Sequence, residues 1–146
     1  MSVVRLVRLV SPGMEERGRG RIVHITSLVA KDPAPVLPIS STLRSGLMAL
    51  TKLQAFQLAP FGITVNGVLP GHTLTDRQTH LAQLRAKDTG ISVEEALRNQ
   101  AREIPAGRIA DPSEIAAAVA FLCSEKASYI TGVSLLVDGG ITRGLA

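Results

Sequence analysis

The hydrophobic positions of this chain fall into short runs that glycine and proline separate. Three runs rich in β-branched residues, at 21–26, 63–69 and 133–137, are bounded by turn residues and predict strands. Between them lie longer segments whose apolar residues recur every three or four positions, which is the spacing of a helix. Strands that alternate with helices predict right-handed crossovers and a parallel sheet. The pattern therefore indicates an α/β fold.

Two of the predicted helices carry more apolar surface than one packed face needs. Residues 1–10 are apolar apart from two arginines, and we expect this helix to be buried on much of its circumference until Pro12 disturbs it. After a loop at 28–39, which holds three prolines, the segment 42–59 is helical with two apolar stripes, which predict burial on two sides. The stripes are Leu43, Leu47 and Leu50, and Ala49, Leu53 and Phe56.

The segment 75–108 is more polar and predicts two shorter helices, the second beginning with a capping box from Ser92 to Glu95. Asp111-Pro-Ser-Glu114 predicts the start of another helix, with Asp at the N-cap, Pro at the first helical position and Glu at the third. Three strands are few for a parallel sheet. We therefore interpret residues 1–146 as a single partial domain, with 75–108 as a helical lobe inserted in it.

The composition disfavours several classes of function. The hydrophobic fraction is 45%, but no apolar run reaches the roughly 18–20 residues that span a bilayer, so we expect no membrane partner. The net charge of +4 invites a nucleic-acid interpretation, yet the chain has no Trp, one Tyr and three Phe for base stacking, and we expect no nucleic-acid partner. The single cysteine, Cys123, excludes an internal disulfide and is typical of a cytoplasmic protein.

Six short motifs follow one another along nearly the whole chain. On these motifs the chain resembles the C-terminal half of the short-chain dehydrogenase/reductase family, and within it the 3-oxoacyl-carrier-protein reductases. The resemblance implies part of a Rossmann-type doubly wound parallel sheet and an NAD(P)-dependent oxidoreductase that interconverts hydroxyl and ketone groups. The motifs are Gly20-Arg-Ile-Val-His-Ile-Thr-Ser27, Gly62-Ile-Thr-Val-Asn-Gly-Val-Leu-Pro-Gly71, Pro105-Ala-Gly-Arg108, Asp111-Pro-Ser-Glu114, Tyr129-Ile-Thr-Gly132 and Val137-Asp-Gly-Gly140.

The resemblance places three residues at the family's catalytic positions. Ser27 falls where a serine orients the substrate carbonyl, Ser40 falls where the catalytic Tyr would stand, and Arg44 replaces the catalytic Lys. A phenol titrates at about 10 and a cation can lower its pKa, whereas an aliphatic hydroxyl is a far weaker acid. Arg44 can still hold ribose or phosphate through its planar donors. The alternative is that residues 40–42 only cap the helix, a role that suits Ser and Thr.

The loop after the second strand resembles the family's cofactor clamp. Its Pro-Gly-x-x-x-Thr pattern is matched by Pro70, Gly71 and Thr75. The resemblance implies that the backbone near Thr73 meets the nicotinamide carboxamide and that the Thr75 hydroxyl meets a phosphate oxygen of NAD or NADP. A simple strand-to-helix turn is the alternative that Pro-Gly predicts by itself.

None of the three histidines is predicted to do chemistry. We expect His24 to be a strand side chain with its hydrogen bonds satisfied. His72 and His80 have no carboxylate or cysteine at metal-ligand spacing, so no metal site is predicted.

The glycine-rich fingerprint with which the family holds the pyrophosphate, Thr-Gly-x-x-x-Gly-x-Gly, does not occur in the sequence. We therefore interpret the chain as a truncated oxidoreductase for a small carbonyl or alcohol substrate, inactive by itself. The alternatives are a catalytically inactive homologue that serves as a subunit partner or interaction module, and a non-functional gene fragment. The family also implies a homo-oligomer, through the helix 42–59 and the C-terminal helix and strand.

Overall fold

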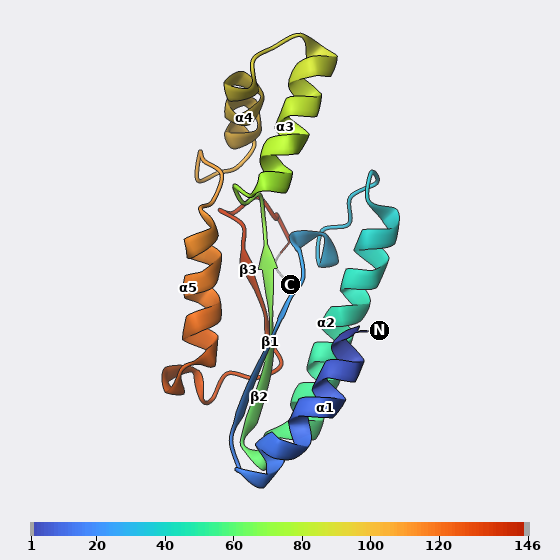
Figure 1. The fold of residues 1–146 in the computed structure, drawn as a ribbon, viewed down its shortest axis with the longest axis vertical. Coiled ribbons are helices and arrows are strands. Elements are labelled where there is room, and N and C mark those ends of the chain that lie inside the picture. Colours follow the sequence, from blue (N-terminus) through green and yellow to red (C-terminus); the bar gives the residue numbers. More distant parts are fainter. Residues whose placement is uncertain (1, 145–146) are drawn as a thin grey trace.

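In the computed structural model, which describes residues 2–144, one parallel sheet forms the middle of three layers (Figure 1). Its strands are β1 (Gly20–Ile25), β2 (Ile63–Pro70) and β3 (Ser134–Val137), in the order β1-β2-β3. Both neighbouring pairs are parallel. The predicted α/β fold with three parallel strands is confirmed.

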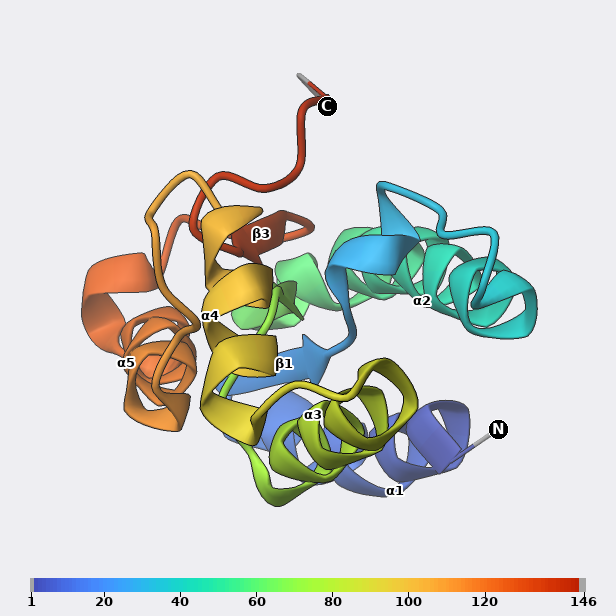
Figure 2. The same cartoon turned by 90° about the horizontal axis from the view of Figure 1, so that it is seen from above.

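Helices cover both faces of this sheet (Figures 1 and 2). On one face lie α1 (Ser2–Glu16) and α2 (Pro38–Leu58), and on the other lies α5 (Pro112–Cys123). The helices α3 (Asp76–Thr89) and α4 (Val93–Arg102) pack against each other beyond the carboxyl ends of the strands. Three short 3-10 helices, Leu28–Ala30, Ala59–Phe61 and Glu125–Ala127, connect these elements.

The central strand β2 supplies side chains to two separate cores. Successive side chains of a strand point to opposite faces, so Ile63 and Val65 pack toward α1 and α2 while Val68 packs toward α5. The first core is completed by Val7, Ala55 and Leu58, and the second by Ile115 and Leu122.

Asn66, at the centre of β2, is fully buried with both ends of its amide bonded. Its Nδ2 donates to the Ile130 carbonyl over 2.8 Å, and its Oδ1 accepts from the Val133 N–H over 3.2 Å. Because a buried amide is costly unless it is satisfied, these two bonds fix the segment that leads into β3 against the middle of the sheet.

The helix α1 differs from its prediction in two ways. It continues through Pro12 to Glu16, with Pro12 exposed to solvent. Only Val7 is buried, whereas Leu6, Leu9 and Val10 are exposed, so the expected burial on much of the circumference is wrong for this chain. One face of α1 packs on the first core, and within residues 2–144 no other element covers the opposite face. Met1, part of the predicted helix, lies outside the described residues.

The helix α2 begins at Pro38, four residues before the predicted start. Proline suits the first helical position because its N–H is absent and its φ is already helical. The N-cap residue is Leu37, which makes no capping bond with its side chain. Ser40 is the third helical residue, so the interpretation that residues 40–42 only cap the helix is wrong. Of the two predicted stripes, Leu43, Leu53 and Phe56 are exposed, so the described chain by itself does not cover both sides of α2.

Both helix starts predicted in the polar half of the chain have a side-chain cap, but only the second is a complete capping box. Ser92 Oγ accepts from the Glu95 N–H over 3.1 Å at the start of α4. At the start of α5 the Asp111 N–H donates to Glu114 Oε2 over 2.9 Å, which completes the capping box. None of the helices in residues 2–144 combines the length and the apolar composition that crossing a bilayer requires.

Candidate active site at the carboxyl edge of the sheet

The candidate residues gather at the edge where all three strands end. The last residue of β1, Ile25, lies opposite Val68, and Pro70 at the end of β2 lies opposite Val137 at the end of β3. The segments that follow these strands therefore share one edge of the sheet. In doubly wound α/β folds this carboxyl edge is where ligands bind.

Ser27 lies just beyond β1, with extended backbone (φ −170°, ψ 156°). Its Oγ caps the 3-10 helix Leu28–Ala30 by accepting from the Val29 N–H over 3.4 Å. The side chain is half-buried. A serine oxygen that accepts a bond still has its own proton to give, so the Ser27 hydroxyl can donate to a ligand oxygen.

Arg44 joins Ser40, the other candidate residue on α2, to the segment that follows β1. Its Nε donates to Ser40 Oγ over 3.2 Å, one helical turn earlier. Its Nη1 donates to the carbonyl of Thr26, the residue before Ser27, over 2.5 Å. One half-buried guanidinium thus bonds Ser40 and the residue before Ser27, which links the three residues predicted at the catalytic positions.

Two serines of α2, neither of which was predicted to hold a loop, bond the segment between β1 and α2. Ser41 Oγ accepts from the Ala34 N–H over 3.2 Å and donates to the Leu37 carbonyl over 2.9 Å. Ser45 Oγ donates to the Ala30 carbonyl over 2.8 Å. The signal available in the sequence was their spacing, since residues four apart share one face of a helix.

The predicted cofactor residues lie together on the loop between β2 and α3. Gly71 donates its N–H to the Val137 carbonyl over 2.9 Å, and a Cβ on Gly71 would lie 2.7 Å from Asp138 Cα. Only glycine permits this approach of the two strand ends. Thr73 Oγ1 donates back to the Gly71 carbonyl over 3.2 Å. Thr75 is the N-cap of α3, where its Oγ1 accepts from the Gln78 N–H over 3.3 Å.

These residues fit one end of a dinucleotide. A hydroxyl at the start of a 14-residue helix suits a phosphate oxygen, and an arginine that stays charged suits a ribose or phosphate. The glycine-rich loop that brings backbone N–H groups close to a pyrophosphate is a different element, and the 146 residues contain no such fingerprint.

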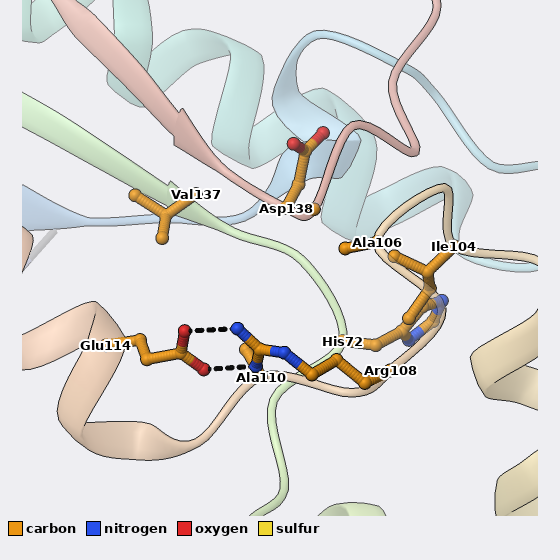
Figure 3. Close-up of a pocket in the computed structure, with 9 residues that line it drawn as sticks. His72, Ile104, Ala106, Arg108, Ala110, Glu114, Val137 and Asp138 are labelled. Atoms are coloured by element: carbon orange, nitrogen blue, oxygen red, sulfur yellow. Dashed lines mark hydrogen bonds and ion pairs between the residues drawn. The ribbon is translucent and has the colours of Figure 1, made fainter.

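A small pocket of about 70 Å³ lies beside this loop, between α5 and the end of β3 (Figure 3). It is far too small for a dinucleotide and contains none of the predicted site residues. One wall is the ion pair of Arg108 and Glu114, which meet through two hydrogen bonds of 2.6 and 2.7 Å. The Arg108 guanidinium, with help from the Asp111 N–H, lowers the pKa of Glu114 to about 2. The ion pair thus ties Arg108, which precedes α5, to the first turn of that helix.

Of the histidines, His24 is buried and its Nε2 lies 2.8 Å from Gln54 Oε1 on α2. This is the satisfied strand side chain that the sequence predicted. Within the described part of the chain, no three His, Cys, Asp or Glu side chains come close enough to share a metal ion. His72, in contrast, has a contact that sequence reasoning missed, because its partner Gln100 lies 28 residues away.

A parallel sheet with helices on both faces, and polar side chains gathered at the carboxyl ends of its strands, defines a Rossmann-type ligand-binding domain. A family model described as Enoyl-(Acyl carrier protein) reductase matches residues 1–142. The chain is 36% identical over 140 residues to the 3-oxoacyl-[acyl-carrier-protein] reductase FabG of Vibrio cholerae, covering 96% of this chain and 53% of that protein. The chain therefore belongs to the short-chain dehydrogenase/reductase family, as its motifs predicted. It spans about half the length of the curated relatives it matches.

Two solved structures extend the comparison. The L-sorbose reductase of Gluconobacter frateurii, in complex with NADPH and L-sorbose, is 37% identical with a TM-score of 0.95, over 99% of this chain and 56% of that one. An NADPH-bound short-chain oxidoreductase of Pseudomonas aeruginosa PAO1, described as containing an atypical catalytic center, is 34% identical with a TM-score of 0.85. That likeness covers 98% of this chain and 54% of the Pseudomonas chain.

Proposed function

We propose that this chain is the substrate- and nicotinamide-facing part of an NAD(P)-dependent oxidoreductase that interconverts hydroxyl and ketone groups of a small molecule without a catalytic tyrosine. The observation that carries the proposal is the guanidinium of Arg44, bonded to Ser40 Oγ and to the backbone beside Ser27. Relatives named as NADPH-dependent reductases support the cofactor, and the Pseudomonas enzyme offers a precedent for an atypical centre.

Each of the three residues has a distinct role in this proposal. The Ser27 hydroxyl donates a hydrogen bond to the carbonyl oxygen of the substrate. Arg44 stays charged at any working pH and stabilises the negative charge that develops on that oxygen. Ser40 orients the guanidinium by accepting from Nε, and it is too weak an acid to replace a phenol as the proton donor.

The cofactor, when bound, supplies the hydride that ketone reduction adds to carbon. Pro70, Gly71, Thr73 and Thr75 form the loop that would meet its nicotinamide and phosphate groups. The proton that the oxygen gains comes from water held near Ser27 and Arg44. The pyrophosphate fingerprint does not occur in these 146 residues. We therefore expect the chain to hold the cofactor only together with the other half of a Rossmann-type domain, one that carries this fingerprint and is called the glycine-rich half below.

The test measures NADPH-dependent ketone reduction by residues 1–146 joined in one chain to a glycine-rich half. We expect Ser27→Ala to lower kcat about 100-fold, the effect of losing one donor to a developing oxyanion. Ser40→Ala should lower it far less, and Ser128→Ala, an exposed serine far along the chain, should leave it unchanged. Equal activity of Ser27→Ala and Ser128→Ala would exclude Ser27 from the reaction.

A second candidate is a non-catalytic partner module, and one surface favours it. Large apolar side chains are exposed on α1 and α2, among them Leu9, Leu53 and Phe56, the last 86% exposed. We propose that this face, together with Phe121 on α5 and Leu135 on β3, makes contacts in a homo-oligomer. The partner module is favoured if residues 1–146 form a stable oligomer and, joined to a glycine-rich half, show neither turnover nor NADPH binding.

We also propose a cytoplasmic location. Cys123 is exposed and unpaired in the described residues, which suits a reducing compartment. Reading the genomic DNA upstream of the Met1 codon is a further test of the oxidoreductase. An in-frame glycine-rich fingerprint there supports the truncated enzyme, and its absence favours the partner module or a gene fragment.

A further inference from the structure

Two glutamines and a histidine form a buried chain of hydrogen bonds between the helical lobe and the cofactor loop. Gln78 Nε2, on α3, donates to Gln100 Oε1 on α4. Gln100 Nε2 in turn lies 2.8 Å from Nδ1 of His72. Gln78 and Gln100 are only 9% and 6% exposed. Buried amides of this kind are costly unless every partner is in place, so the chain defines one relative position of its three segments.

His72 occupies a central place in the loop, between Gly71 and Thr73. Its backbone carbonyl accepts from the Ala110 N–H over 3.0 Å, and Leu74 donates its N–H to the Ala110 carbonyl over 2.8 Å. The loop is therefore held by backbone bonds to Ala110 and by the hydrogen bond of the His72 side chain to Gln100. Thr73 and Thr75, which the proposed function assigns to the cofactor, flank these anchor points.

The lobe meets the end of the sheet through the segment after α4, where Ile104 is buried against Gly139, but α3 and α4 themselves have a small core of their own. The core of α3 and α4 is built from Ala82, Ala86 and Ala96 and is separate from the two cores of the sheet. These two helices pack mainly on each other, at the end of the molecule beyond the strands (Figure 1). Directional polar bonds can supply the fixed geometry that this small core does not.

We propose that Gln100, supported by Gln78, is a positioning residue for the cofactor loop, because it holds Thr73 and Thr75 in their binding orientation through the side chain of His72. This inference rests on the proposed function of the loop. It adds two residues of the lobe to the machinery of cofactor binding, and it makes the position of the lobe and that of the loop depend on each other.

The chain of bonds has a direction that a proton on His72 opposes. Gln100 Nε2 can donate to Nδ1 only while that nitrogen carries no hydrogen, and a protonated ring would require both glutamine amides to turn over. Burial, followed by the charge of Arg85, lowers the pKa of His72, while Glu103 opposes the shift. Three further charged residues, Arg108, Glu114 and Asp138, line the same small pocket as His72. The chain of hydrogen bonds is therefore intact at pH values above 6.5, the pKa of a free imidazole. It is lost as the pH falls below 6.5 and passes through the lowered pKa of His72.

Amide hydrogen exchange tests the positioning role without any turnover. In Gln100→Met, which keeps the length of the side chain and removes its amide, we expect the amides of Leu74 and Ala110 to exchange about tenfold faster, the effect of losing one such bond. The control is Gln83→Met, an exposed glutamine on α3, which should leave both amides unchanged. The amides of β2 report that each variant is folded. Equal exchange in the two variants overturns the inference.

The pH profile separates positioning by His72 from a merely structural role. Protection of Leu74 and Ala110 should fall below pH 6.5 in the wild-type protein, relative to β2, and should not in His72→Asn, whose amide can occupy the place of Nδ1 without titrating. A profile that His72→Asn leaves unaltered contradicts the inference. In the chain joined to a glycine-rich half, Gln100→Met should also raise the Kd for NADPH. Faster loop exchange in Gln100→Met with an unchanged Kd for NADPH refutes the link to the cofactor. If the wild-type joined chain binds no NADPH, the proposed function is refuted, and the exchange result alone decides whether Gln100 positions the loop.

Discussion

Arg44 donates a hydrogen bond from Nε to the Ser40 hydroxyl oxygen, over 3.2 Å and one turn of α2. These are the two residues that the resemblance predicts at the positions of the catalytic Lys and Tyr, and they are in direct contact. A second donor of the same guanidinium reaches the Thr26 carbonyl. We call these two bonds of one guanidinium the Arg44 fork, and the compact ammonium of a lysine cannot reproduce it. The pair is therefore a mutually adapted arrangement, and exchanging one member alone breaks it.

The first prediction concerns the stability that this fork provides. Arg44→Met removes the donors to both Ser40 and Thr26, and we expect the free energy of unfolding to fall by about 1–3 kcal/mol, the range for bonds from a charged donor. The free energy of unfolding of Arg44→Lys should lie between those of the wild type and Arg44→Met. Urea denaturation measures the effect, with Arg98→Met, an exposed arginine on α4, as the control. Equal midpoints for Arg44→Met and the control would show that the fork adds nothing.

A second prediction follows from a hydroxyl that the fold leaves without a partner. Thr64 on β2 is 5% exposed, and its Oγ1 makes no hydrogen bond within the described residues. Thr64→Val replaces the hydroxyl with a methyl group of similar size, and we expect the free energy of unfolding to rise by about 1 kcal/mol. Thr51→Val is the matched control, because the buried Thr51 hydroxyl donates to the Leu47 carbonyl over 2.8 Å. Stabilisation by both variants, or by neither, would argue against the explanation.

The sequence predicted the sheet well because its signals are local. Each strand is a β-branched run between turn residues, and the capping box of Asp111 and Glu114 is complete within four positions. The start of α2 was missed because Ser40 to Thr42 resemble a cap, whereas Pro38 already sets a helical φ and the hydroxyl of Thr42 bonds back to the Pro38 carbonyl.

Parts of the site depend on contacts that no local pattern encodes. The motif order predicts roles for Ser27, Ser40 and Arg44, but the bond from Arg44 to a backbone carbonyl 18 residues away leaves no mark on side-chain spacing. The His72–Gln100–Gln78 chain joins three segments through neutral amides, which occur on most surfaces and carry no signature. The buried faces of α1 and α2 were overestimated because apolar periodicity shows which surface needs a cover, and the cover can belong to another chain.

The third prediction uses the lowered pKa of Glu114. A carboxylate whose pKa falls on folding, here from 4.5 to about 2, stabilises the folded state fully above 4.5 and loses that contribution as pH falls toward 2. We expect Glu114→Gln to be less stable than the wild type at neutral pH, with a difference that shrinks as pH falls from 4.5 to 2. Chemical denaturation at several pH values measures it, beside Glu94→Gln on the exposed face of α4. A difference independent of pH would contradict the assigned ion pair.

The fourth prediction addresses the exposed face of α2. Phe56→Glu places a charge on the exposed apolar surface of α2, and we expect it to convert an oligomer of the chain to a smaller species. Light scattering during size-exclusion chromatography measures the mass. Gln57→Glu adds the same charge at the next position of the helix, already polar and exposed, and should leave the mass unchanged. An unaltered mass for Phe56→Glu would remove this face from the interface.

The central claim is that these residues carry the substrate and nicotinamide side of a reductase site and need a glycine-rich half to hold the cofactor. Isothermal titration with NADPH tests it in two forms of the protein, residues 1–146 alone and the same residues preceded in one chain by such a half. We predict no measurable binding to the first form and binding at about micromolar Kd, a usual range for substrates and cofactors, to the second. Micromolar binding by residues 1–146 alone, or no binding by the joined chain, would contradict the claim.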